Sequence, residues 1–176
     1  MATFAYSLLL RADEVTHISC AHIAEVEEGL KILIPTSKTD VMRGGQFIFL
    51  SKENTLLTDL FWRYLEKGNL TLEHNNFLFP KLRFDTHTKE LRVTNEMLTY
   101  DKYRNVIRKH MDNLGLDKAL FGTHSCRSGG ATTLAAQADQ YQLMLSGRWR
   151  DPRSLGSYVA VEDSKRLETS KLLFLL

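Results

Sequence analysis

The residues best suited to chemistry in this chain are four basic side chains and one aromatic hydroxyl. In chain order they are Arg11, Lys38, His124, Arg127 and Tyr158. Guanidinium groups are planar hydrogen-bonding forks that match the oxygens of a phosphate. A tyrosine hydroxyl held beside such cations is favoured as the phenolate, which is a nucleophile. The set therefore suits nucleophilic attack on a phosphodiester.

The spacing of these residues is more informative than their types. His124 and Arg127 form an H-x-x-R sequence, Trp149 lies 22 residues after Arg127, and Tyr158 lies nine residues after Trp149. Glu14 follows the first arginine by three residues. Taken singly, each has an ordinary explanation: a helix-surface ion pair, a solvated lysine, or aromatic residues of a core. Their joint order is what points to one site.

Helices and strands of the amino-terminal half must position the first residues of the set, Arg11, Glu14 and Lys38. Residues 8–20 have the mixed pattern of a short helix with one buried face. Three strands of a small antiparallel sheet are expected at 21–26, 30–35 and 46–50. Lys38 then lies on the connection between the second and third strands. The most regular helical periodicity covers 55–68, where Gly68 is a stop signal.

The second half is expected to be mainly helical. Residues 68–92 are predicted to be a loop, with short strands near 77–79 and 91–93. Thr99 can cap a helix running to Asn113, with Tyr103, Ile107, His110 and Leu114 on one face. Small residues allow close helix contact in the next predicted helix, 128–138, which His124 opens. Further helices are expected at 139–145 and from the Asp151-Pro152 start signal, the last carrying Tyr158.

Composition restricts the class of protein without selecting a function. The chain of 176 residues is 43% hydrophobic and 25% charged, as in ordinary globular domains, and its net charge is +2. Two cysteines without a CxxC predict neither a disulfide framework nor a thiolate metal site. No apolar run is long enough for a membrane span, and no secretion signal is visible, so we expect an intracellular protein.

With this order of residues the chain resembles the catalytic domain of the tyrosine recombinases, the phage-integrase family that breaks and rejoins DNA. Seven family positions are filled, by Arg11, Glu14, Lys38, His124, Arg127, Trp149 and Tyr158. Tryptophan is an accepted variant where many relatives have histidine. Three short segments are most similar to recombinases of eukaryotic mobile elements of the Crypton and DIRS kinds: Ser37-Lys38-Thr39-Asp40, His124-Ser125-Cys126-Arg127-Ser128-Gly129-Gly130 and Gly147-Arg148-Trp149.

The resemblance implies a fold and an activity. The fold is α+β and mainly α-helical, with a small antiparallel three-stranded sheet, and it covers residues 1–176 as one catalytic domain. The family's amino-terminal core-binding domain is expected to be absent. The activity is site-specific DNA cleavage and rejoining, in recombination or integration, through a covalent 3′-phosphotyrosyl intermediate. A mobile-element origin would place the protein in the nucleus.

The resemblance also implies a role for each site residue. Tyr158 is the nucleophile, Arg11 and Arg127 grip the phosphate, and Lys38 protonates the departing 5′ oxygen. His124 donates to a phosphate oxygen or helps to move the Tyr158 proton, and Trp149 directs its indole N–H at the phosphate. The Glu14 carboxylate holds Arg11 or His124 in place. Because two arginines stabilise the charge and the phosphotyrosine conserves the bond energy, we expect no metal and no cofactor.

The expected partner is double-stranded DNA. Phosphate contacts are assigned to Lys102, Arg104, Arg108, Lys109, Arg148, Arg150 and Arg153, which would give salt-dependent affinity. The apolar end, 171–175, is a candidate for packing within the chain or into a neighbouring subunit, because recombinases of this family act as tetramers on two DNA sites. A membrane partner is not expected.

Two other functions fit the same residues. A type IB topoisomerase shares the arginine, lysine, histidine and tyrosine chemistry but relaxes supercoils as a monomer. A domesticated transposon domain could retain DNA binding after losing catalysis, although intact Tyr158 and both arginines count against it.

Overall fold

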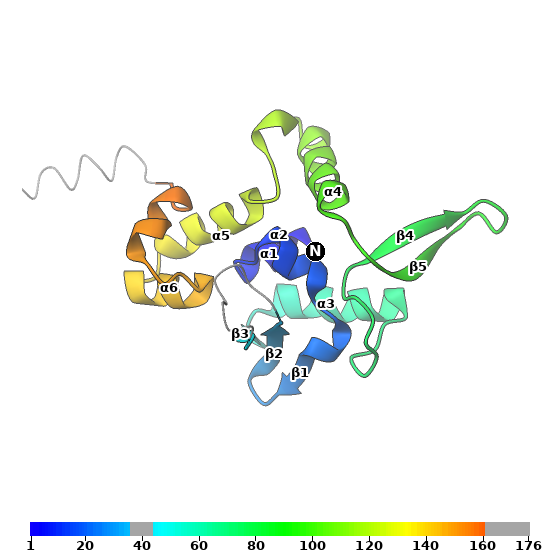
Figure 1. Ribbon diagram of the computed structural model, residues 1–176, viewed down its shortest axis with the longest axis horizontal. Coiled ribbons are helices and arrows are strands. Elements are labelled where there is room, and N and C mark those ends of the chain that lie inside the picture. The colour runs from blue at the N-terminus through cyan, green and yellow to red at the C-terminus, as the bar shows by residue number, and fades with distance from the viewer. Residues whose placement is uncertain (36–43, 161–176) are drawn as a thin grey trace, which may run out of the picture.

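A computed structural model of the chain describes residues 1–35 and 44–160 (Figure 1). Lys38 and the C-terminal residues 161–176 lie outside the described residues, so what was expected of them stays a prediction. The described part combines helices with a three-stranded antiparallel sheet, which confirms the predicted fold class. Within it, no helix has both the length and the apolar character needed to cross a membrane.

The helices and strands follow one another along the whole described chain. The α-helices are α1 (Ala2–Ser7), α2 (Ala12–His17), α3 (Thr55–Gly68), α4 (Tyr100–Asn113), α5 (Ser125–Ala135) and α6 (Gln140–Gly147). The strands are β1 (Ile23–Val26), β2 (Gly29–Ile34), β3 (Gln46–Ser51), β4 (Pro80–Asp85) and β5 (Glu90–Met97). Short 3-10 helices are η1 (Cys20–His22), η2 (Lys118–Leu120) and η3 (Pro152–Ser157). In Figure 1, α5 and α6 lie on one side of the central α1 and α2, and the β4–β5 hairpin projects on the other.

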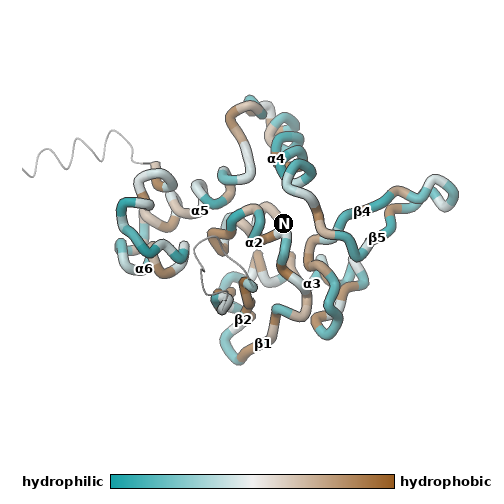
Figure 2. Tube along the Cα trace, in the orientation of Figure 1, coloured by the Kyte–Doolittle hydropathy of each residue, from teal (hydrophilic) through white to brown (hydrophobic). Residues whose placement is uncertain are grey.

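The predicted sheet is confirmed. Its order is β1-β2-β3, with both neighbouring pairs antiparallel. Leu30, Ile32 and Ile34 of the central strand are buried, and the residues between them are half-buried, which is the alternation of a strand with one face on the core. Hydrophobic segments of the sheet, the first helices and α3 form the main core (Figure 2).

Helix α3 is also as expected. The Asn54 side chain accepts a hydrogen bond from the backbone N–H of Leu57 at its start, and Asn69 ends it in the left-handed conformation. Leu57, Phe61 and Leu65 bury one face of the helix.

The short helix predicted within residues 8–20 is confirmed only in part, as α2 over Ala12–His17. The chain forms two short helices, with Leu9 between them in the left-handed region at φ 49°. Glu14 accepts a hydrogen bond from the backbone N–H of Arg11, which starts α2 afresh at Ala12. Because Leu8, Leu9 and Leu10 are all buried, this stretch is a packed turn rather than an amphipathic helix.

The expectation for residues 68–92 is partly confirmed, because the short strand expected near 91–93 lies within β5. The rest is wrong: β4, over Pro80–Asp85, pairs with β5 as a hairpin, and near 77–79 Phe77 makes only an isolated bridge to Ser19. Cross-strand pairs join Leu82 to Val93 and Phe84 to Leu91, yet all four side chains are exposed. A hairpin that buries so little apolar surface gives a weak strand signal in the sequence.

Helices at the carboxyl end are largely as expected. Helix α5 begins and ends three residues before its predicted limits, and Asp139 caps α6. Asp151 and Pro152 do start an element, but it is 3-10 rather than α, and Tyr158 is the residue that ends it. The predicted buried face of α4 is confirmed for Tyr103 and Ile107 only. His110 and Leu114, one and two turns further on, are exposed because the helix end extends past the core.

Close contact between α1 and α5 depends on Gly130. A Cβ atom at this position would lie 2.2 Å from the carbonyl oxygen of Tyr6 and 2.7 Å from Cδ2 of Leu9. The small-residue sequence therefore does permit close helix contact, and it brings the turn at Leu9 against the helix that carries Arg127.

Replacing Gly130 with alanine is expected to reduce the free energy of unfolding by about 1–3 kcal/mol, because a backbone atom cannot yield as a side chain can. Chemical denaturation of both proteins measures the difference. Gly129→Ala is the matched control, since its Cβ would meet only the mobile ring of Tyr6, at 3.1 Å. Equal stability of the Gly130→Ala and Gly129→Ala proteins would show that the two helices can separate freely.

Candidate active site

Arg127 is at the centre of the predicted site. Its side chain, on α5, is fully buried, and its two terminal nitrogens donate to the carbonyls of Leu9 and Gly147. The guanidinium carbon lies 4.5 Å from the centre of the Trp149 ring and 5.2 Å from that of Tyr158. One arginine thus joins the turn before α2, the end of α6 and the two aromatic residues that follow it.

The two aromatic residues form a second, smaller core. The ring centres of Trp149 and Tyr158 are 5.2 Å apart, and both pack against Leu9, Ala131 and Leu143. Trp149 is 7% exposed, whereas Tyr158 is half-buried. Nε1 of Trp149 is buried and has no hydrogen-bond partner among the described residues, which leaves a donor available.

Gly147 allows this indole ring to fold back on the end of α6. A Cβ atom at Gly147 would lie 1.8 Å from Cζ3 of Trp149, so only glycine fits against the ring. The helix ends at the next residue, Arg148, which is left-handed at φ 58°. The G-R-W sequence therefore has a local structural basis: its glycine makes room for its tryptophan.

Glu14 lies between the basic residues. Its side chain is fully buried, and Oε1 accepts a hydrogen bond from Nη1 of Arg11 at 2.7 Å. Oε2 accepts from the backbone N–H of Arg11 at 2.8 Å and from Nη2 of Arg148 at 2.6 Å. Nη1 of Arg127 lies 3.9 Å from the same oxygen. Glu14 was expected to hold a basic residue in place, and in the structure its carboxylate is the shared counter-charge of three arginines.

The pKa values follow from this arrangement. Burial opposes ionisation of Glu14, but Arg148 and Arg11 outweigh it and hold the pKa of the carboxyl below its ordinary value. Burial, with Arg11 and Arg148 nearby, lowers the pKa of Arg127 to about 10. Among the described residues, three guanidinium groups face one carboxylate, and this excess of positive charge favours an anionic ligand.

The structure brings Arg11, Glu14, Arg127, Trp149 and Tyr158 together, through contacts between α2, α5, the end of α6 and η3. His124 is exposed and stands at the start of α5, one turn before Arg127, without a side-chain cap bond. Lys38 belongs to the residues that the structure does not describe.

Arg148 is placed differently from the sequence-based expectation. Its side chain is only 6% exposed and is directed to Glu14, so it does not lie on an open DNA-facing surface. Contacts across 134 residues of chain decide this, and a local motif cannot report them. The one sequence signal was its position between Gly147 and Trp149.

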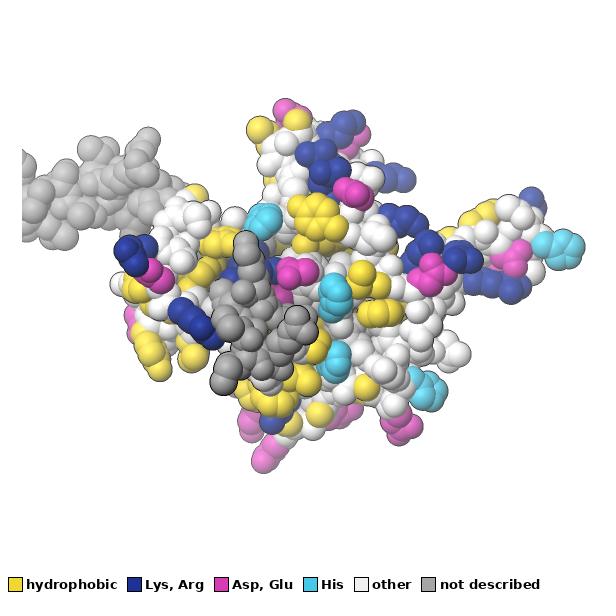
Figure 3. Space-filling view, in the orientation of Figure 1, with side chains coloured by type: hydrophobic (Ala, Val, Ile, Leu, Met, Phe, Trp, Pro, Cys, Tyr) yellow, Lys and Arg dark blue, Asp and Glu magenta, His cyan; other side chains and the backbone are white. Residues whose placement is uncertain are grey.

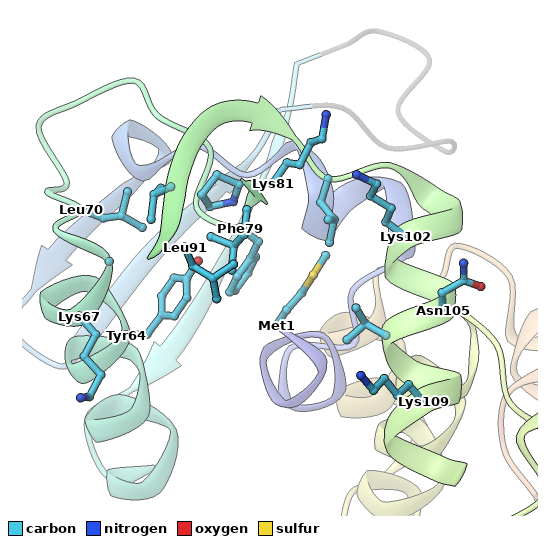
Figure 4. A pocket seen from close by; sticks show the side chains of 16 residues that line it. Met1, Tyr64, Lys67, Leu70, Phe79, Lys81, Leu91, Lys102, Asn105 and Lys109 are labelled. Atoms are coloured by element: carbon cyan, nitrogen blue, oxygen red, sulfur yellow. The ribbon is translucent and has the colours of Figure 1, made fainter. Parts of the chain in front are cut away.

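The other basic residues assigned to DNA do not form one surface. Arg104 pairs with Asp101, and Arg108 donates to the carbonyl of Phe121. Lys102 and Lys109 line a groove beside α4 whose lining includes neither Arg104 nor Arg108 (Figure 4). Arg150 is exposed, and Arg153 is exposed and paired with Asp151. Figure 3 shows Lys and Arg side chains gathered along α4 and at the base of the β4–β5 hairpin.

The groove beside α4 has a volume of about 740 Å³ and lies apart from the arginine cluster. Tyr64 and Phe79 are among its apolar lining residues, and Lys67 and Lys81 join the two lysines of α4 around it (Figure 4). None of its lining residues is among the predicted catalytic residues, although Lys102 and Lys109 were assigned to DNA binding. Among residues 1–35 and 44–160, no group of three or more histidine, cysteine or acidic side chains is arranged to hold a metal ion.

The solved structures to which this chain is similar in fold include several DNA recombinases. The XerH site-specific recombinase, bound to a palindromic difH substrate after cleavage, has a TM-score of 0.73 at 14% identity. That match covers 98% of this chain and 44% of XerH. The XerA recombinase has a TM-score of 0.67 at 14% identity, covering 97% of this chain and 55% of that one. The fold is that of a tyrosine recombinase catalytic domain.

A third tyrosine recombinase structure agrees with these two. The Tn1549 transposon integrase, in complex with circular intermediate DNA, has a TM-score of 0.62 at 19% identity. Nearly all of this chain matches it, while the chain spans 58% of the integrase. The sequence matches no protein-family model and no curated protein. At these identities the likeness to tyrosine recombinases is one of fold.

Proposed function

We propose that this chain cleaves and rejoins DNA strands, in recombination or integration, through a 3′-phosphotyrosyl intermediate. The observation that carries the proposal is the half-buried Tyr158, whose ring lies 5.2 Å from the guanidinium of Arg127 within a cluster of excess positive charge. The tyrosine recombinase fold supports it, because the XerH and Tn1549 integrase structures are DNA complexes.

The reaction uses the residues as follows. A DNA phosphate approaches Arg11 beside the buried Arg127, and the positive charges of both arginines stabilise the charge that develops on its oxygens. The Tyr158 oxygen attacks phosphorus, and the bond from phosphorus to the 5′ oxygen breaks. Lys38 gives a proton to that oxygen. Rejoining reverses these steps, so the bond energy is conserved and no nucleotide is consumed.

Trp149 and His124 complete the proposed site. The buried Nε1–H of Trp149 lacks a partner among the described residues, and a small movement of the ring would offer it to a phosphate oxygen. His124, exposed at the start of α5, is placed to donate to a phosphate or to move the tyrosine proton. Since guanidinium groups supply the charge stabilisation, we propose that the chemistry requires no metal ion.

The wider setting is proposed from the sequence. The G-R-W and H-S-C-R-S-G-G sequences suggest a recombinase of a Crypton- or DIRS-type mobile element, acting in a nucleus. DNA backbone contacts are proposed for Arg104, Arg108, Arg150 and Arg153, together with the lysines of α4. Assembly on two DNA sites through the C-terminal residues 171–175 is a further proposal about residues outside the described part.

A suicide substrate tests the function. We expect a nicked duplex to trap a covalent protein–DNA adduct, seen as a band of reduced mobility in a denaturing gel, and to do so equally in EDTA. Tyr158→Phe should form none. A 5′-thiolated bridging phosphate, which leaves without a proton, should restore cleavage to Lys38→Ala but not to Tyr158→Phe.

Other results would indicate other functions. DNA retention in a native gel without any adduct would favour the silent binding module. An adduct accompanied by relaxation of a supercoiled plasmid, with no joining between two sites, would favour a type IB topoisomerase activity. Loss of the adduct in EDTA would contradict the metal-free mechanism.

A further inference from the structure

The guanidinium of Arg148 forms hydrogen bonds to Glu14 and to the Leu8–Leu9 turn, both far from it in the sequence. Its Nη2 lies 2.6 Å from Oε2 of Glu14 and 3.2 Å from the carbonyl oxygen of Leu9. Its Nη1 lies 3.4 Å from the carbonyl oxygen of Leu8. Its side chain is 6% exposed, and its terminal nitrogens are bonded to one carboxylate and to the backbone carbonyls of Leu8, Leu9 and Ser146.

The atoms that Arg148 contacts are shared with the two arginines of the proposed clamp. The Leu9 carbonyl also accepts from Nη1 of Arg127, and Oε2 of Glu14 also accepts from the backbone N–H of Arg11. Oε1 of the same carboxylate holds the Arg11 side chain. Arg148 therefore connects the end of α6 to both halves of the clamp through common acceptors.

Arg148 has a backbone conformation in which a large side chain is unusual. The residue ends α6 in the left-handed conformation, at φ 58°, where glycine is the usual and least strained choice. Backbone geometry alone would thus favour glycine, and at this position the side chain adds contacts that glycine lacks. These contacts place a further guanidinium on Glu14, beside those of Arg11 and Arg127.

We propose that Arg148 is a positioning residue, which holds Glu14, and through it the Arg11 guanidinium, in the arrangement that receives the DNA phosphate. The inference rests on the proposed function. It differs from a phosphate-binding role, because Arg148 acts on the reaction only through Glu14 and the Leu8–Leu9 turn. A misplaced Arg11 would then slow cleavage while leaving most DNA contacts intact.

The Arg148→Gly protein tests this. We expect adduct formation to slow by about 10²-fold, the effect of a small misplacement of a reacting group. DNA affinity at matched salt should stay within about twofold, because no exposed charge is lost. Lys89→Gly is the matched control: Lys89 has a similar left-handed backbone, at φ 59°, but is exposed in the turn of the β4–β5 hairpin. It should cleave as the wild-type chain does.

Two readouts separate positioning from a purely structural role. A cavity of about 460 Å³ reaches Arg148 beside Gln46, Met144 and Trp149. Free guanidinium ion at millimolar concentration should therefore enter the space vacated in Arg148→Gly and restore cleavage about tenfold, whereas sodium at equal ionic strength should not.

The second readout is the pH profile of cleavage. Among the described residues, the charged groups facing Glu14 are Arg11 from the start of α2, Arg127 from α5 and Arg148 from the end of α6. Losing one of three cations raises the pKa of Glu14, so the acid limb of the cleavage rate should move to higher pH in Arg148→Gly. Arg148→Lys keeps the charge and should keep the wild-type acid limb, with a partly restored rate.

The outcomes are distinct. An Arg148→Gly protein that cleaves at the wild-type rate overturns the inference, as does one whose DNA affinity falls as far as its cleavage rate. Loss of thermal stability and cleavage together, with neither guanidinium rescue nor a shifted acid limb, also overturns it. If the wild-type chain forms no adduct at all, it is the proposed function that fails.

Discussion

Replacement of Arg127 by lysine is expected to slow formation of the phosphotyrosyl adduct by about 10³-fold or more, the scale of a lost arginine in phosphoryl transfer. Lysine keeps the positive charge but has no planar fork, so it cannot donate to the Leu9 and Gly147 carbonyls together. It also cannot stack in the same way between Trp149 and Tyr158. Single-turnover cleavage of the nicked substrate measures the change.

Arg63→Lys is a suitable control for this variant, because Arg63 is exposed on α3 and has no part in the site. Thermal unfolding of the Arg127→Lys protein should accompany the kinetics, since two backbone carbonyls lose a donor. A cleavage rate close to wild type in a folded Arg127→Lys protein would mean that the guanidinium is only a structural link, and the proposed mechanism would then need another cation.

Replacement of Glu14 by glutamine is expected to lower the free energy of unfolding by about 3–5 kcal/mol, the scale of removing one partner from a buried ion pair. Arg11, Arg127 and Arg148 would then face each other without their shared carboxylate. Urea denaturation at neutral pH measures the loss. Glu66→Gln, an exposed change on α3, should have almost no effect.

The pH dependence of this difference has a definite sign. The pKa of Glu14 is lower in the folded protein than in the unfolded chain, so its contribution is fully present above the unfolded value, near ~4.3. This contribution to stability is lost as the pH falls through the pKa that Glu14 has in the folded protein, because the carboxylate then becomes protonated. The gap in stability between wild type and Glu14→Gln should therefore be widest at neutral pH and close in acid. A gap that is unchanged in acid would show that shape, rather than charge, makes Glu14 important.

The sequence by itself determined the elements whose signals are local. The periodicity of 55–68 and the stop at Gly68 predicted α3, and the alternating segments predicted all three strands of the sheet. Thr99, Asp139 and Asp151 marked the starts of later elements, because a capping side chain acts on backbone groups two or three residues away. The order of arginines, tryptophan and tyrosine also marked residues that the fold does bring together.

Only the tertiary structure decided where each charge faces. Lys102 and Lys109 belong to one side of α4 and Arg104 and Arg108 to another, so a cluster in the sequence is not one surface in space. Arg148 was expected at the protein surface, yet its partner Glu14 lies 134 residues away in the chain. Helix caps and periodicity act over a few residues, whereas burial of a charge depends on which distant segments pack around it and offer a counter-charge.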